Sequence, residues 1–197
     1  ASGLHNISVL VNNAAIPCYG VPLAEMAQEQ IMNSLQTNLV TPIILTNRLY
    51  STIIKNAPGA VININSIVGI EPKILRSVHS ATKWGLRGFS KSLRLEASDA
   101  EIKVINVYPS RVMTTPEFEY GLEPSEFMKS LRIILVGESC FSTAGQKNLN
   151  LKRNIMSKRI LICGANGFIG KNLLKRFYRR KGFNIRATYF NTAPDMN

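Results

Sequence analysis

Short apolar runs alternate with long amphipathic segments along most of this 197-residue chain, and this alternation constrains the fold more than any other feature. In chain order, the runs and the segments with helical spacing are 8–12, 23–31, 34–55, 60–65, 79–97 and 102–108. Continuous apolar runs are typical of parallel strands buried on both faces. Strands that alternate with helices of this length indicate crossover units. We therefore expect an α/β fold with a doubly wound parallel sheet.

The same pattern restarts near the C-terminus, around a glycine-rich turn. An apolar run at 158–163 is followed by Gly164-Ala165-Asn166-Gly167-Phe168-Ile169-Gly170, a helical segment at 171–180 and a second run at 184–190. Glycines at this spacing between a strand and a helix permit a tight turn, close approach of a pyrophosphate and close packing of helix on strand. The helix N-terminus then favours the anion. We interpret this segment as a dinucleotide-binding unit, with a ligand-free glycine turn as the alternative.

One stretch combines three groups that could transfer a proton. Ser66 ends an apolar run, and His79 and Lys83 stand four residues apart in a helical segment, so both can reach one small volume. A hydroxyl, a titratable ring and an ammonium that converge there predict a proton-transfer site. A turn-capping role for Ser66 is the alternative.

Charge and cysteine content argue against other classes of function. Residues 131–197 carry 13 Lys and Arg against two Asp and Glu, and so hold 11 of the 12 net positive charges. No aromatic platform is interleaved with these charges, so we expect a solvated basic surface and no nucleic-acid partner. Three cysteines without paired spacing, and only two histidines, predict no metal site. No apolar run approaches the length of about 20 residues that spans a membrane, and the N-terminus lacks signal-peptide features. We therefore expect a cytoplasmic protein.

Five motifs in order resemble those of the short-chain dehydrogenase/reductase family. They are Asn12-Asn13-Ala14-Ala15, Asn38 within TNLVTP, Ser66, His79-Ser-Ala-Thr-Lys83, and the segment 109–114, PSRVMT. Residues 7–115 are similar to the later part of the family's single-domain branch. The resemblance implies a Rossmann-like fold, a catalytic set of Asn38, Ser66, His79 and Lys83, and contacts to NAD or NADP from Asn13, Lys83 and Thr114. It also implies hydride transfer to or from a small carbonyl or alcohol, and a homodimer assembled through the helices at 34–55 and 79–97.

Residues 156–191 resemble the opening of a different branch of the family, the extended nucleotide-sugar epimerases and dehydratases. This resemblance assigns cofactor contacts to Gly164, Gly167, Phe168, Ile169 and Gly170. A non-catalytic binder of NAD(P) or of a nucleotide sugar is therefore the alternative function. We divide the chain into a dehydrogenase-like part at 1–130, a linker with an edge strand (132–136) at 131–155, and a dinucleotide-binding unit at 156–197. The junction of two reductase pieces would explain this division.

Two departures from the family pattern predict impaired activity. The family's cofactor loop would precede residue 1, and the sequence begins without it. His79 stands where the family has tyrosine, whose pKa of about 10 suits proton exchange beside a lysine. A histidine, with a pKa of about 6.5 that Lys83 would lower, could accept a proton but is a poor donor.

The choice between NAD and NADP stays open. No acid follows the glycine turn at about 20 residues to hold a ribose hydroxyl.

The two pieces can complete one sheet if strand 158–163 pairs with strand 7–11. Each strand otherwise exposes an apolar edge. The expected order across the sheet is 184–190, 158–163, 7–11, 60–65, 102–108 and then 132–136. This would be an incomplete, circularly permuted Rossmann-like sheet, with the glycine turn beside Asn13 and Thr114.

Overall fold

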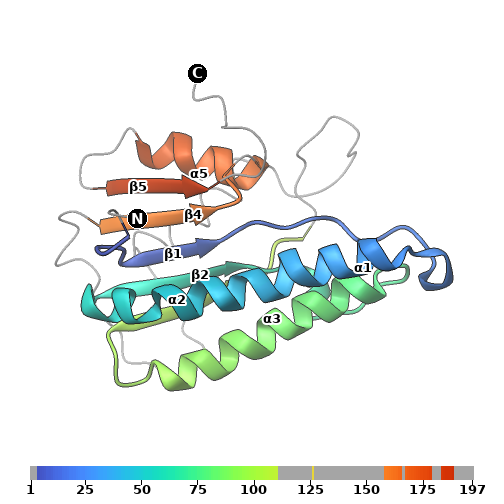
Figure 1. Ribbon diagram of the computed structural model, residues 1–197, viewed down its shortest axis with the longest axis horizontal. Coiled ribbons are helices and arrows are strands. Elements are labelled where there is room, and N and C mark those ends of the chain that lie inside the picture. The colour runs from blue at the N-terminus through green and yellow to red at the C-terminus, as the bar shows by residue number, and fades with distance from the viewer. Residues whose placement is uncertain (1–3, 111–125, 127–157, 166, 179–182, 189–197) are drawn as a thin grey trace.

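The structure is a computed structural model that describes residues 4–110, 126, 158–165, 167–178 and 183–188. Figure 1 shows its elements, and their bounds in chain order are β1 (Val9–Asn12), η1 (Leu23–Glu25), α1 (Gln28–Leu35), η2 (Gln36–Val40), α2 (Thr41–Lys55), β2 (Gly59–Ile64), η3 (Ile67–Gly69), α3 (Ser77–Glu96), β3 (Ile102–Val107), β4 (Lys158–Cys163), α5 (Phe168–Tyr178) and β5 (Phe183–Thr188).

The five described strands form one parallel sheet in the order β3-β2-β1-β4-β5. The first strand of the chain thus lies between its second and its fourth, and Leu10 is in register with both Val61 and Leu161. This confirms the predicted α/β class and the predicted order of these five strands. The expected edge strand 132–136, the linker 131–155 and Thr114 lie outside the described residues.

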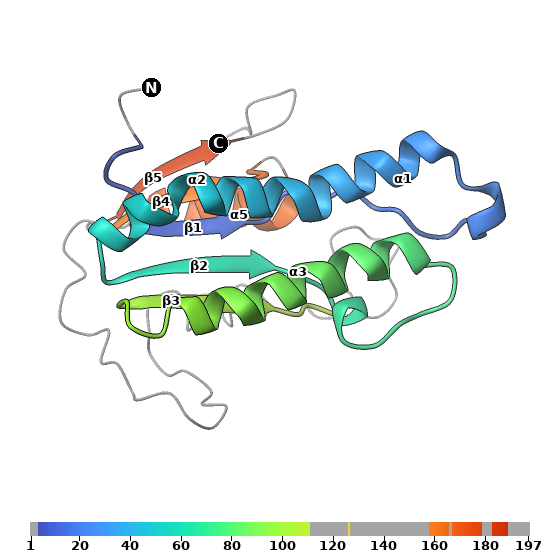
Figure 2. The same cartoon turned by 60° about the horizontal axis from the view of Figure 1, so that its bottom comes forward.

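Helices bury both faces of the sheet, which explains why its central strands are mostly apolar. In Figure 2, α2 and α3 lie along one face and α5 lies behind the sheet on the other. On the α2 and α3 side, Leu10 packs in a buried cluster with Ile53 and Val61. On the α5 side, Val11 packs in a second cluster with Leu173. Residues 10 and 11 point to opposite faces because side chains alternate along a strand.

The expected helix at 23–31 is wrong in part. Leu23–Glu25 is a single 3-10 turn with no buried residue, so no packing supports a longer helix there. The chain is extended at Met26 and Ala27, and the Gln30 side chain then accepts a hydrogen bond from the Ala27 N–H (3.2 Å) at the start of α1. From Gln28 to Lys55 the backbone is helical throughout, with a π-helical segment at Gln36–Val40. In the described part of the chain, no helix is both long and apolar enough to cross a bilayer.

Candidate active site

Polar side chains gather where β1 and β2 end. The Asn12 Nδ2 donates to Asn63 Oδ1 (2.8 Å) and to Thr46 Oγ1 (3.2 Å), and the Asn63 Nδ2 donates to Ser90 Oγ (2.8 Å). Both asparagines are buried, and Asn12 and Asn63 are partners in the strand register. Sequence reasoning missed this network. Its signal was an asparagine at the end of the run 8–12 and another inside the run 60–65.

Asn38 fixes the loop that follows β1. Its Oδ1 accepts from the Ile16 N–H and its Nδ2 donates to the Ile16 carbonyl, both at 2.9 Å. The same Nδ2 donates to Ser34 Oγ (3.1 Å), and the side chain is 1% exposed. Asn38 lies in the π-helical segment, a local irregularity that is frequent at functional sites. The amide therefore positions residues 13–17 through its own hydrogen bonds.

Ser66 and Lys83 both lie near the end of β2. The Lys83 Nζ donates to the Ile64 carbonyl (3.2 Å), two residues before Ser66, and its side chain is 3% exposed. Burial lowers the pKa of Lys83 to about 8. Ser66 is half-buried and its Oγ accepts from the Val68 N–H at 3.4 Å, so it does cap a short turn, as the alternative assignment held. A hydroxyl that accepts one hydrogen bond still has its proton to donate.

His79 lies one helical turn before Lys83 and is 8% exposed. Its Nδ1 is buried and makes no hydrogen bond. Burial lowers the pKa of His79 to about 4, with further lowering by the charges of Lys83 and Arg76, so the imidazole is neutral at neutral pH. The edge of its ring meets the Tyr19 ring (centroids 5.6 Å apart, planes at 74°), and the Arg76 guanidinium lies 4.5 Å from the Tyr19 ring centroid. Sequence reasoning missed Tyr19 and Arg76.

The glycine turn after β4 packs directly on the loop after β1. The Asn13 Nδ2 donates to the Gly164 carbonyl (2.9 Å). Gly164 has φ +77°, and a Cβ there would lie 2.5 Å from the Ala14 Cα, so only glycine fits. A Cβ at Gly170 would collide with the Gly164 carbonyl oxygen. These two glycines thus serve the turn and the packing of helix on strand, as the spacing predicted.

The middle glycine leaves room for a ligand. Gly167 is exposed, and a Cβ there would meet nothing closer than 3.6 Å. Phe168 and Ile169 begin α5, whose first turn offers N–H groups without intrahelical acceptors and the positive end of the helix dipole. An open backbone surface beside such a helix end fits a pyrophosphate. Within the described ranges, no three His, Cys, Asp or Glu side chains gather as metal ligands would.

A parallel sheet in this strand order, with a glycine turn entering a helix beside its central strands, defines a Rossmann-like α/β protein. A family model described as short chain dehydrogenase matches residues 1–120, and the chain belongs to this family. The family predicted from the five motifs is therefore confirmed, whereas the resemblance of residues 156–191 to the extended branch stays a prediction.

Curated relatives match more than half of the chain. The chain is 34% identical over 137 residues to carbonyl reductase family member 4 of Xenopus tropicalis, covering 70% of this chain and 57% of that protein. It is 32% identical over 136 residues to the 3-oxoacyl-[acyl-carrier-protein] reductase of Homo sapiens, covering 69% and 56%. The chain thus spans about half the length of the curated relatives it matches.

Solved structures share the fold. A short-chain dehydrogenase/reductase from Vibrio parahaemolyticus has a TM-score of 0.54 and 30% identity, over 63% of this chain and 58% of that one. The closed form of a serine dehydrogenase complexed with NADP+ has a TM-score of 0.61 over 72% of this chain and 69% of that one. Its identity of 22% supports a shared fold alone.

Proposed function

We propose that this chain binds NAD or NADP at the carboxyl ends of β1 and β4, where the glycine turn meets the β1 loop, and that it descends from an oxidoreductase acting on a carbonyl or alcohol. The hydrogen bond from Asn13 to the Gly164 carbonyl supports this most directly, because it joins the two pieces at one edge of the sheet. The carbonyl and 3-oxoacyl reductases among its relatives suggest the reaction, and the NADP+ complex of a fold neighbour suggests the cofactor.

Each predicted residue has a proposed role at this site. Gly164, Gly167 and Gly170, with the first residues of α5, Phe168 and Ile169, would hold the pyrophosphate. Asn13, Thr114 and Lys83 would contact the rest of the nucleotide. Ser66 would donate a hydrogen bond to the substrate oxygen, while Asn38 positions the β1 loop. The bound nicotinamide would supply or accept the hydride.

His79 limits this chemistry in the direction of carbonyl reduction. Reduction places a negative charge on the substrate oxygen, which needs a proton donor nearby. A neutral imidazole beside an ammonium is a poor donor, since the pKa of His79 has fallen to about 4. We therefore propose that the activity of this protein is impaired.

The substitution His79→Tyr tests this proposal. Restoring the phenol should raise the rate of NADPH or NADH oxidation with a small ketone at least about tenfold, because a positioned general acid typically contributes a hundredfold or more. His79→Phe, which restores the ring without the hydroxyl, should give no gain. No gain from the tyrosine, in a protein shown to bind NAD(P), would reject the catalytic set of Asn38, Ser66, His79 and Lys83.

A second candidate function is a non-catalytic binder of NAD(P) or of a nucleotide sugar. The neutral, unpartnered His79 and the open surface at Gly167 both favour it. Its structural basis would be the proposed division into a dehydrogenase-like part (1–130), a linker (131–155) and an extended-type unit (156–197). Titration of NADH fluorescence, with UDP-glucose as competitor, separates the two candidates: binding without turnover in the His79→Tyr variant supports the binder.

We also propose a cytoplasmic homodimer that pairs through α2 and α3. Large apolar side chains on these helices are exposed, among them Ile44, Trp84 and Leu95. Sedimentation equilibrium of the full chain should give twice the monomer mass, and Trp84→Glu should return it to the monomer mass.

A further inference from the structure

The carboxyl end of β5 is fixed against the glycine turn. Thr188 is the last residue of β5, and its carbonyl accepts hydrogen bonds from the Gly164 N–H (3.0 Å) and the Ala165 N–H (2.8 Å). The Thr188 side chain forms a hydrogen bond with the thiol of Cys163, its partner in the strand register. The end of β5 is therefore part of the site proposed for the dinucleotide.

The residue at this end of the sheet bears on which dinucleotide fits. In sheets of this kind, an acid about 20 residues beyond the glycine motif accepts from the ribose 2′-hydroxyl of NAD, and an arginine nearby accommodates the 2′-phosphate of NADP. The structure places Thr188 at this strand end, 18 residues after Gly170. Its side chain is exposed and uncharged, so it does not repel a phosphate.

Arg186 stands on the same face of β5 as Thr188. Burial alternates along the strand: Phe183, Ile185 and Ala187 pack on the α5 side, whereas Arg186 and Thr188 are exposed on the other face. Residues two apart in a strand lie on one face, with Cα atoms about 7 Å apart. The long arginine side chain can span this distance along the strand. A guanidinium is thus available beside the strand end that lacks an acid.

No carboxylate in this part of the chain competes for Arg186. Residues 158–188 contain nine Lys and Arg and no Asp or Glu. Across the part of the chain that the structure describes, the one ion pair is Lys73–Glu71 (3.8 Å), so Arg186 pairs with no described acid. A surface with charge of one sign attracts the ligand with more charge of the other sign. A phosphate monoester adds between about one and a half and two negative charges at neutral pH.

We infer that this protein selects NADP over NAD, and that Arg186 binds the 2′-phosphate at the end of β5, beside Thr188. The planar guanidinium fork matches a phosphate through two parallel hydrogen bonds, which are stronger for being charge-assisted. The inference rests on the proposed function for the presence of a dinucleotide. It adds the choice of cofactor and the residue that makes this choice.

Binding of the two reduced cofactors provides the test, without any turnover. NADPH and NADH differ only in the 2′-phosphate, and each is titrated onto the full chain by fluorescence at one fixed ionic strength, because salt screens exposed charges. We expect NADPH to bind about tenfold more tightly than NADH, since hydrogen bonds between charged groups are worth roughly that much.

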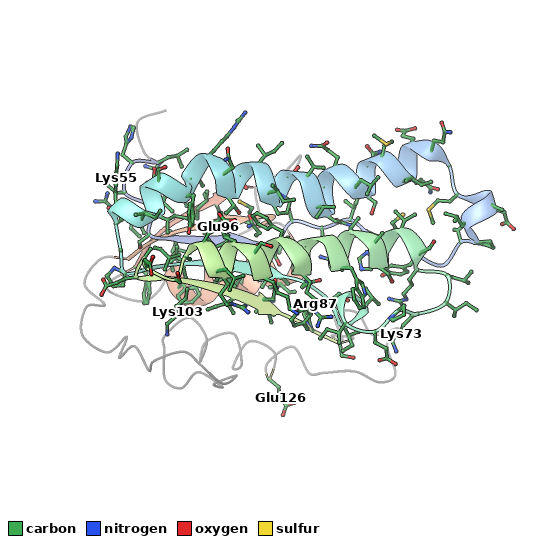
Figure 3. The ribbon with its side chains drawn as sticks, turned by 90° about the horizontal axis from the view of Figure 1, so that it is seen from below. Lys55, Lys73, Arg87, Glu96, Lys103 and Glu126 are labelled. Atoms are coloured by element: carbon green, nitrogen blue, oxygen red, sulfur yellow. The ribbon has the colours of Figure 1, made fainter. Side chains whose placement is uncertain are left out.

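Variants of Arg186 assign the preference to its guanidinium. Arg186→Gln should bring the two affinities within about twofold, and Arg186→Lys should leave an intermediate preference, because an ammonium lacks the fork. Two controls remove the same charge elsewhere and should keep the full preference. Lys175→Gln changes an exposed cation of α5, and Lys103→Gln changes a cation on β3 (Figure 3), the strand at the opposite edge of the sheet from β5.

A change at Thr188 tests the position directly. Thr188→Asp supplies the missing acid, so it should repel the 2′-phosphate and reverse the preference toward NADH. Thr188→Asn has the same size without the charge and should still favour NADPH. Equal affinities in the unchanged protein, a preference that survives Arg186→Gln, or an equal loss in Lys175→Gln would overturn the inference and leave dinucleotide binding in place. Binding of neither cofactor would reject the proposed function, and the inference with it.

Discussion

The two parts of the sheet contribute different groups at the carboxyl ends of its strands. Residues 4–110 carry buried polar side chains near the ends of their strands, such as Asn12 and Asn63, and place the Lys83 ammonium on the carbonyl of Ile64, which ends β2. Residues 158–188 end β4 with glycines, at Gly164 and Gly167, which present backbone and open space. One part holds the side chains that could do chemistry, and the other holds the surface that could bind a phosphate. In the proposed site, neither part is complete without the other.

The junction between the two parts is built like the interior of a single sheet. The Ser8 N–H donates to the Arg159 carbonyl (3.1 Å) on one side of β1, and the Ser8 carbonyl accepts from the Ala60 N–H (2.9 Å) on the other. Leu161 and Ile162 are buried as deeply as Val61 and Ile62. We therefore expect substitutions between β1 and β4 to lower the stability of the protein as substitutions between β1 and β2 do.

The largest effect is expected from a substitution that breaks the contact between the two parts. Gly164→Val adds a side chain at φ +77°, against the Ala14 backbone at 2.5 Å. We expect it to lower the free energy of unfolding by about 3 kcal/mol or more, through overpacking and backbone strain. Urea unfolding measures this. Gly167→Ala, in the same turn but with 3.6 Å of room, is the control and should change stability little. Equal effects of the two variants would contradict the close packing of Gly164.

A smaller effect tests the polar network of the first part. Asn63→Ala removes the hydrogen bonds that join β1, β2 and α3, so Asn12 and Ser90 each lose one buried partner. Stability should fall by about 2 kcal/mol, because the remaining groups are buried. Asn33→Ala, on the exposed face of α1, is the matched control. A loss below about 0.5 kcal/mol for Asn63→Ala would show that the network adds little.

Lowering the pH should destabilise the protein, because His79 is buried as a neutral imidazole. Its folded pKa of about 4 lies below its usual value, so the unfolded chain binds more protons between pH 4 and 6.5. This contribution to stability is complete above pH 6.5 and is lost as the pH falls toward 4, on the order of 1 to 2 kcal/mol after allowance for solvent screening. Comparing unfolding at pH 7 and pH 5 in His79→Phe and in His5→Asn measures it. The first variant should lose this part of the pH dependence, and the second, at an exposed histidine, should keep it.

The smallest expected effect concerns two glycines in α3 and how closely that helix is packed. A Cβ at Gly88 would meet no atom within 4 Å, so Gly88→Ala should stabilise the helix by about 0.5 to 1 kcal/mol. A Cβ at Gly85 would lie 2.9 Å from the Leu39 side chain, so Gly85→Ala should gain less. Thermal unfolding compares the two variants. A larger gain at Gly85 would mean that α3 packs less closely against the helix before it.

The sequence predicted the sheet better than it predicted the site. Strand order could be predicted because apolar runs identify strands and because a doubly wound sheet places its first strand beside its fourth. The hydrogen bond between Asn12 and Asn63 could not, since a slip of one residue in register would turn both side chains to the other face. Tyr19 and Arg76 were missed because Tyr19, which contacts both His79 and Arg76, lies in a loop whose path depends on contacts such as that of Gly20 with Leu75. The break at Met26 and Ala27 was missed because their composition favours a helix that nothing packs against.

Hydrogen exchange of the backbone amides in β1 and β4 tests the central claim most directly, on the full chain without ligand. If these strands pair in one sheet, the amides of Val9–Asn12 and Lys158–Cys163 exchange slowly and at similar rates, and both lose protection in Gly164→Val. Rapid exchange of Lys158–Cys163 while Gly59–Ile64 remains protected would show that the glycine turn belongs to a separate unit, and the proposed cofactor site would not exist.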